Sequence, residues 1–294
     1  MGRILINNTR QTIVIHSFKG GVGKTAITTN LSYFLSQKKN KRILLIDGDI
    51  AAPSYRKVFE SKFKLERILT WTDFLDEKYE FLSGETMKNY IHKTKYPNLD
   101  IIYSPLPELG KKFLSEKSLD WWTSALRNAF LAKELALGEL DYDYMIIDNQ
   151  SGILMNSVNN LTLANIIILV LRPIAYGIDG TAEMIKSIYS SIRNVTNNLW
   201  KQKVFLIWNQ IPYDLENEKE KKKIDAFIEE WNENFETNDF LGIAKIPYDQ
   251  EYTSSMLKYN ENELFGLSNF VLKEIESFWN SVLTVLNRET IKDR

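Results

Sequence analysis

The chain has 294 residues and carries 37 Lys and Arg against 38 Asp and Glu, so its formal net charge is −1. This balance excludes a globally basic nucleic-acid coat, and a hydrophobic content of 44% excludes disorder as the main state. Because cysteine is absent, disulfide frameworks, Cys-ligated zinc, iron–sulfur clusters and thiol nucleophiles are excluded as well.

Seven short apolar runs are separated by longer segments with helical periodicity. The predicted strands lie at 13–15, 43–46, 101–103, 145–147, 166–171, 204–208 and 243–246. Runs without polar alternation are typical of parallel strands that are covered on both faces. The pattern predicts an α/β fold with a doubly wound, mostly parallel sheet of about seven strands and helices on both faces.

The chain shows no internal repeat, low-complexity tract or linker, so residues 1–294 are predicted to form a single domain. An irregular helical segment is expected at about 55–140, between the second strand and the strand at 145–147. The longest strongly apolar stretch, 166–171, is far shorter than the roughly 20 residues of a membrane-spanning helix. We therefore expect a cytoplasmic protein without an integral membrane segment.

A glycine-rich sequence, FKGGVGKT at 18–25, follows the first strand and opens a helix near Ala26. Strand, glycine-rich turn, Lys-Thr and helix in this order predict a phosphate-binding loop. Glycines permit positive φ and let backbone N–H groups converge on phosphate oxygens at the positive end of the helix dipole. Lys24 is expected to reach the β- and γ-phosphates, and the Thr25 hydroxyl to coordinate Mg²⁺. The predicted nucleotide-binding residues of the loop are Gly20, Gly21, Val22, Gly23, Lys24, Thr25 and Ala26.

Two of the predicted strands end in carboxylates. Asp47 and Asp49 follow the run at 43–46, and Asp148 follows the run at 145–147. At the carboxyl ends of strands, beside a phosphate loop, such a fold places water-positioning and metal-binding groups.

The form KGGVGKT, with Phe18 in place of the usual first glycine and a lysine at Lys19, resembles the deviant Walker A motif of the ParA/MinD family of P-loop ATPases. The other motifs follow in the family's order, so the resemblance covers nearly the whole chain. It implies a Mg²⁺-dependent ATPase that acts as a nucleotide-switched homodimer around ATP. In that dimer Lys24 acts in cis, and Lys19 reaches the phosphates bound by the partner subunit.

The resemblance also implies roles for the carboxylates and for the segment that follows the Walker B strand. Asp49 would orient the attacking water, Asp47 would support Mg²⁺, and Asp148 would hold Mg²⁺ through water. Gly152 matches the switch glycine whose N–H senses the γ-phosphate. The implied catalytic residues are Lys19, Lys24 and Asp49, and the implied metal-binding residues are Thr25, Asp47 and Asp148.

Two further matches concern the base. Asn209, at the end of the strand at 204–208, resembles the family's adenine-reading asparagine, whose amide offers both a donor and an acceptor. Asparagine is also a common turn former at a strand end, so a structural role is the alternative. Pro247 and Tyr248 belong to an IPYD sequence that resembles the turn lining the other side of the base.

The sequence departs from the family pattern at three places. Asn149, Gln150 and Ser151 stand where the family has a proline-containing switch, and Ala26 stands where many members have a second threonine. The sequence at 49–54, DIAAPS, is closer to that of the iron–sulfur-carrier relatives, which need cysteines that this chain lacks.

Two basic clusters, 37–42 and 219–223, are candidate nucleic-acid surfaces. For the first we favour a structural role at the end of a helix, where lysines complement the dipole and Asn40 can adopt the left-handed cap. The last predicted helix, at about 267–286, has the apolar stripe of a packed helix, which favours packing on the sheet over membrane anchoring.

The resemblance leaves the cargo open. The first expectation is partitioning or positioning of DNA or another cellular cargo, with nonspecific DNA as a candidate partner of the ATP-bound dimer. The alternative is a regulator or adaptor that binds an unidentified protein partner without DNA. A membrane-associated MinD-like ATPase and an ATP-dependent biosynthetic ligase rank below both.

Overall fold

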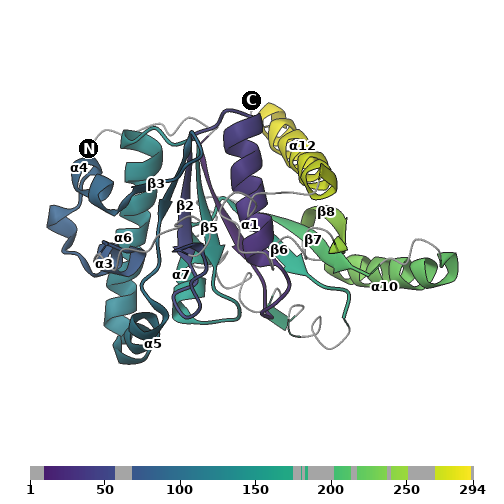
Figure 1. The fold of residues 1–294 in the computed structure, drawn as a ribbon, viewed down its shortest axis with the longest axis horizontal. Helices are drawn as coiled ribbons and strands as arrows, with labels where there is room; N and C mark the ends of the chain where they lie inside the picture. The colour runs from purple at the N-terminus through teal and green to yellow at the C-terminus, as the bar shows by residue number, and fades with distance from the viewer. Residues whose placement is uncertain are drawn as a thin grey trace. The chain divides into compact units, whose positions relative to one another are not determined.

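In the computed structural model, structure is described for residues 10–56, 68–174, 180, 183–184, 202–212, 217–236, 240–250 and 269–292. The chain divides into two compact units that interleave in sequence (Figure 1). The first unit comprises Met1–Ile15 and Leu31–Asn165, and the second comprises His16–Asn30 and Ile166–Arg294.

The first unit is built on five strands in the order β3-β4-β2-β5-β1. Their bounds are β1 (Gln11–His16), β2 (Ile43–Gly48), β3 (His92–Lys93), β4 (Leu99–Ile102) and β5 (Tyr144–Asn149). All pair in parallel except β3, which runs antiparallel to β4 at the edge. Every residue of β2, β4 and β5 is buried, as the apolar runs without polar alternation predict.

Helices of the first unit pack on these strands and on one another. Their bounds are η1 (Phe34–Lys38), α3 (Trp71–Asp76), η2 (Tyr79–Phe81), α4 (Gly84–Met87), η3 (Lys88–Tyr90), α5 (Pro107–Glu116), α6 (Leu119–Glu134), η4 (Leu135–Glu139) and α7 (Met155–Leu163). Helix α6 contacts α3 and α7, and α7 contacts β2 and β5 (Figure 1). Helix α1 (Lys24–Tyr33) begins in the second unit and ends in the first.

The second unit holds three parallel strands in the order β6-β7-β8. They are β6 (Ile166–Leu171), β7 (Lys203–Ile211) and β8 (Phe240–Pro247). Helices α10 (Glu218–Glu236) and α12 (Asn269–Lys292) both contact β8. The apolar stripe of α12 is buried and consists of Val271, Ile275, Phe278, Trp279 and Val282. The prediction that the last helix packs on the sheet is therefore confirmed, although the helix extends to Lys292.

The predicted doubly wound α/β fold is confirmed, and all seven predicted strands are present. The described residues contain an eighth strand, β3, which has two residues and no apolar run and so escaped prediction. The expected helical segment at 55–140 contains short helices but also β3 and β4. The assignment of a single domain stays a prediction. Within the described ranges, no helix has the length and apolar character needed to cross a membrane.

Candidate nucleotide-binding site

The loop between β1 and α1 has the backbone geometry that a phosphate cradle requires. Gly21 has φ +76° and Gly23 has φ +91°, a region that side chains other than glycine rarely adopt. A Cβ atom on Gly23 would also collide with the amide of Asn209. The N–H of Ile27 donates to the Gly23 carbonyl at 3.0 Å, so the loop leads directly into the first turn of α1.

The two lysines of the loop differ in exposure. Lys24 lies at the start of α1 with only 7% of its surface exposed, and Thr25 beside it is half-buried. Lys19 is exposed, and its carbonyl accepts a hydrogen bond of 2.7 Å from the hydroxyl of Ser17. The structure thus places one lysine inside the loop and the other at its surface.

Asn209 lies against the phosphate loop at the end of β7. Its Nδ2 donates to the carbonyl of Val22 at 2.8 Å, and its side chain is buried. A primary amide has two N–H donors and one acceptor, so this bond engages a single donor. The bond fastens Asn209 to the loop, and both the adenine-reading role and the turn-forming alternative stay predictions.

Pro247 and Tyr248 lie at the end of β8, beside the end of β7. The N–H of Tyr248 donates to the carbonyl of Ile211 at 2.8 Å, and Ile211 pairs with Pro247. The ring of Tyr248 is 49% exposed, so this aromatic surface is accessible in the second unit.

Two contacts of the loop were not predicted from the sequence. Phe18, which replaces the usual first glycine, packs so closely on Gly180 that a Cβ there would collide with its ring. Gln210 has a positive φ of 55° and places its Nε2 3.2 Å from where a Cβ on Gly23 would stand. Neither contact has a sequence signal, because both join residues far apart in the chain.

In the first unit, Asp47 and Asp148 are brought side by side. They are register partners on β2 and β5, and both are buried. By distance and angle, neither carboxylate oxygen of Asp47 has a hydrogen-bond partner among the described residues, although the backbone N–H groups of Ser104 and Tyr55 lie near it. Burial, followed by the charges of Asp148 and Asp49, raises the pKa of Asp47 well above its ordinary value, against a small opposing effect of nearby backbone N–H groups.

This pair fits the magnesium role implied for it. A buried carboxylate without a hydrogen-bond donor is costly unless a cation approaches it. Magnesium prefers carboxylate oxygens as protein ligands and completes its shell with water and phosphate oxygens. Among the described residues no cluster of three or more acidic or histidine groups is suited to hold a metal.

Asp49 is half-buried, and its Oδ1 accepts a hydrogen bond of 3.0 Å from the N–H of Ala52. The following residue, Ile50, contacts α5. A Cβ on Gly110 of that helix would collide with the carbonyl oxygen of Ile50. A local turn and a close helix therefore fix the backbone that carries Asp49.

The segment after Asp148 is held by amide side chains where the family has proline. Asn149 Oδ1 accepts from the N–H of Gln150 and from Nδ2 of Asn160, both at 3.0 Å. Gly152 has φ +79°, and its carbonyl accepts from the hydroxyl of Ser157 at 2.9 Å. Side-chain amides and hydroxyls thus order the segment after Asp148 without a proline ring.

The predicted site residues form two sets, each gathered within its own unit. The set in the second unit comprises the loop residues Lys19, Gly20, Gly21, Val22, Gly23, Lys24, Thr25 and Ala26 with Asn209, Pro247 and Tyr248. The set in the first unit comprises Asp47, Asp49, Asp148 and Gly152. Within the first unit, Ile15 of β1 pairs with Asp148, and the chain enters the loop directly after β1.

Comparison with known proteins agrees with this geometry. The AAA_31 family model, described as an AAA domain, matches residues 10–201. A virulence plasmid ParA family protein of Chlamydia psittaci is 29% identical over 202 residues, which cover 68% of this chain and 70% of that protein.

Two solved structures share the fold. The complex of ATP with an aspartate-to-alanine variant of McdA from Cyanothece has a TM-score of 0.71 at 17% identity and covers 94% of this chain and 97% of its own. A putative plasmid partition protein from Borrelia burgdorferi, bound to AMPPNP, has a TM-score of 0.62 at 22% identity. The match covers 96% of this chain and 99% of the Borrelia chain. The family match, the ParA relative and the lysine-bearing loop lead to one assignment: the chain belongs to the ParA/MinD family of P-loop ATPases.

Proposed function

We propose that this protein is a Mg²⁺-dependent ATPase that acts as a nucleotide-switched homodimer in partitioning or positioning DNA or another cellular cargo. The observation that carries the proposal is the phosphate loop, with its two left-handed glycines and buried Lys24 at the start of α1. The McdA and Borrelia proteins bind ATP and AMPPNP, respectively, which supports an adenine nucleotide as the ligand here.

Nucleotide binding follows from the chemistry of the loop. Backbone N–H groups at the start of α1 and the ammonium of Lys24 bind phosphate oxygens, where the helix dipole also favours negative charge. Asn209 and Tyr248 bind the adenine base, the first through its amide and the second through its exposed ring. Thr25 of the second unit and Asp47 and Asp148 of the first are the residues that would hold a magnesium ion. The ion would supply positive charge against the negative charge of the phosphates.

Hydrolysis is assigned to Asp49. Its carboxylate orients a water molecule for attack on the γ-phosphorus, the bond to the β–γ bridging oxygen breaks, and ADP and phosphate form. Positioning matters to this step more than to binding, so removal of Asp49 leaves a form that retains ATP. The turn that fixes Asp49 through Ala52 supports this role, since a water-positioning group must be held in place.

Dimerisation is assigned to Lys19. Its exposure supports a role outside its own loop, since Lys24 already supplies a cation within it. A second ammonium at the surface has a clear use on phosphates bound by a partner copy. ATP therefore bridges the two copies, and hydrolysis releases them.

Light scattering tests the proposal directly. The Asp49→Ala variant with Mg·ATP is expected to have the mass of a dimer, and the additional substitution Lys19→Ala is expected to return it to a monomer. The matched control is Lys219→Ala in the same background, because Lys219 is an exposed lysine on α10. A monomer in every case, or a dimer in every case, would count against the switch.

The alternatives raised by the sequence have less support. The plasmid-associated names of two similar proteins favour a DNA cargo over an adaptor or a ligase. The apolar stripe of α12 is buried, which leaves that part of the helix without a face for a membrane.

A further inference from the structure

Helix α7 has a row of asparagines on its buried face. Asn156, Asn159 and Asn160 are spaced as neighbours on one side of a helix, and all three are buried. Apolar residues ordinarily occupy the buried face of a helix. Buried amides are costly unless they are hydrogen-bonded, and asparagine is a poor helix former. The partners of these amides therefore indicate the role of the face.

Asn156 and Asn160 connect α7 to the end of β2. Nδ2 of Asn156 donates to the Gly48 carbonyl at 2.8 Å. A Cβ atom on Gly48 would stand 3.1 Å from Nδ2 of Asn160 and 2.8 Å from the carbonyl oxygen of Asp148, so a side chain there has no room. Helix α7 contacts both β2 and β5. It thus touches the backbone immediately before Asp49, the residue assigned to hydrolysis.

The Gly48 carbonyl accepts a second hydrogen bond, which the N–H of Ile50 donates at 3.1 Å. A carbonyl oxygen has two lone pairs and can accept from both donors. The two peptide groups that flank Asp49 are therefore linked through one oxygen, and Asn156 ties that oxygen to a helix. Together with the bond from the N–H of Ala52 to Asp49 Oδ1, these contacts fix the carboxylate.

The start of α7 is itself held by the segment that contains Gly152. Nδ2 of Asn160 donates to Oδ1 of Asn149 at 3.0 Å, and Nδ2 of Asn149 donates to the Ser157 carbonyl at 3.1 Å. The Ser157 hydroxyl donates to the Gly152 carbonyl at 2.9 Å. A side chain can position another group only when its own place is set by its neighbours. Asn156 meets that requirement, because the turn of α7 that carries it is bonded on both sides.

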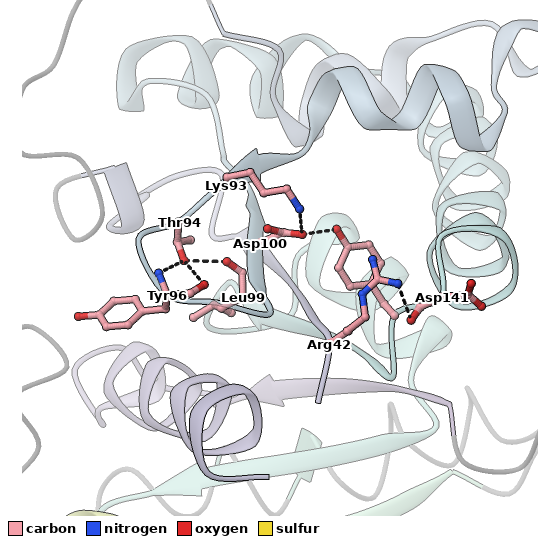
Figure 2. Close-up of polar contacts among 8 residues, drawn as sticks. Arg42, Lys93, Thr94, Tyr96, Leu99, Asp100 and Asp141 are labelled. Atoms are coloured by element: carbon pink, nitrogen blue, oxygen red, sulfur yellow. Dashed lines mark hydrogen bonds and ion pairs between the residues drawn. The ribbon is translucent and has the colours of Figure 1, made fainter. Parts of the chain in front are cut away.

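Side chains also donate to carbonyls at the opposite end of the strands, with a different result. There the Thr94 hydroxyl donates to the Leu99 carbonyl at 2.7 Å and closes a loop on itself (Figure 2). Donor and acceptor are 5 residues apart in that bond and 108 apart in the bond from Asn156 to Gly48. The first bond shapes a turn, whereas the second joins a helix to a distant loop. Stability alone gives no reason for the second bond to end beside Asp49.

We propose that Asn156 is a positioning residue for ATP hydrolysis, which acts through the Gly48 carbonyl on the orientation of Asp49. The proposal rests on the proposed function, in which Asp49 orients the attacking water. Asn156 is bonded to the backbone beside Asp49 and not to a reacting group, so its loss leaves the assigned nucleotide contacts in place. A small displacement of a water-orienting group lowers kcat much more than it lowers affinity.

The test compares Asn156→Leu with Asn159→Leu. Asn159 is the matched control, because its Nδ2 donates from the same buried face to the Trp122 carbonyl of α6 at 2.9 Å. Both variants remove one buried amide donor, so both are expected to lower the free energy of unfolding. We expect Asn156→Leu to lower kcat by about 10- to 100-fold and to keep ATP affinity within about twofold of wild type. Asn159→Leu is expected to keep both at the wild-type values. Phosphate release measures kcat, and isothermal titration calorimetry measures affinity.

A double variant separates positioning from stability. In Asp49→Ala the group on which Asn156 acts is missing, so the addition of Asn156→Leu should not lower the residual kcat further. Independent roles would multiply the two losses. Asn156→Ser is the second single variant, because serine is too short to reach the Gly48 carbonyl, and it replaces the leucine variant if that variant does not fold.

The outcomes distinguish this inference from the proposed function. Wild-type turnover in Asp49→Ala would refute the role assigned to Asp49, and this inference with it. If Asp49→Ala loses turnover while Asn156→Leu and Asn156→Ser keep it, the positioning role alone is wrong. Equal losses of kcat in Asn156→Leu and Asn159→Leu, or a further loss in the double variant, would also overturn it. A loss of ATP affinity as large as the loss of kcat would assign Asn156 to nucleotide binding instead.

Discussion

Two buried aspartates of the first unit, Asp47 and Asp100, lie at opposite ends of the neighbouring strands β2 and β4 and have opposite surroundings. Asp100 accepts hydrogen bonds from Tyr142 and Lys93, at the end where the strands begin. Neither oxygen of Asp47 has a side-chain hydrogen-bond partner among the described residues, only backbone N–H groups lie near it, and its neighbour across the strands is another acid. The same side chain is therefore hydrogen-bonded by two side chains at one end of these strands and by none of the described side chains at the other.

The contrast between Asp47 and Asp100 fails most clearly if no ligand binds at the carboxyl ends of the strands. Lys24→Ala removes the buried cation of the loop after β1, so we expect ATP affinity to fall by at least about 100-fold, or about 2.7 kcal/mol. Lys19→Ala is the matched control and is expected to leave ATP binding by the monomer largely intact. Isothermal titration calorimetry measures both. Unchanged affinity in Lys24→Ala would refute the phosphate-loop assignment.

The variant Asp100→Asn tests the role of the aspartate at the amino-terminal end of β4. A neutral amide weakens two charge-assisted hydrogen bonds of a buried group, so we expect a loss of about 2 kcal/mol in the free energy of unfolding by urea. Lys93→Gln is expected to cost less than about 1 kcal/mol, because the Lys93 side chain is 79% exposed. Nucleotide affinity stays at the wild-type value in both. If wild type and Asp100→Asn were equally stable, Asp100 would not stabilise the fold and would not differ from Asp47 in this respect.

The last test concerns the pH dependence of stability at Asp47. Its pKa is raised in the folded state, so the folded protein holds a proton that the unfolded chain has released, and stability falls as pH rises above the ordinary aspartate value. Asp47→Asn removes this dependence. Without nucleotide or magnesium, we expect the Asp47→Asn variant to become more stable relative to wild type as pH rises from about 4 to 7.

Urea unfolding at a series of pH values measures that difference. Repeating it with Mg·ATP is the control, because a cation beside Asp47 stabilises the charged form in wild type and the advantage of the variant should vanish. A difference between the two proteins that does not change with pH would show that Asp47 is no less satisfied than Asp100.

The parts of this molecule that could be predicted from sequence are those set by local order. The seven strands were predictable because strands buried on both faces need unbroken apolar runs. The loop was predictable because its glycines, lysine and threonine are consecutive. Asn40 was expected to take the left-handed cap and has φ +51°.

What could not be predicted depends on contacts between distant residues. The bond from Asn209 to Val22 and the packing of Phe18 on Gly180 join separate segments. Asn156 reaches the Gly48 carbonyl only because α7 packs on β2. Sequence alone identified Asp47 as an acid, but its burial without a side-chain hydrogen-bond partner among the described residues is visible only in the fold.

Helix α5 approaches the backbone after Asp49 so closely at Gly110 that one added methyl group would have no room. A residue without a side chain thus limits how the loop that carries Asp49 can be placed. In a screen for loss of ATPase activity, substitutions at Gly110 would score beside those of the aspartates. Such substitutions at Gly110 would act by pushing two backbones apart and not by changing a reacting group. A survey of mutational tolerance could therefore mistake Gly110 for part of the reaction centre.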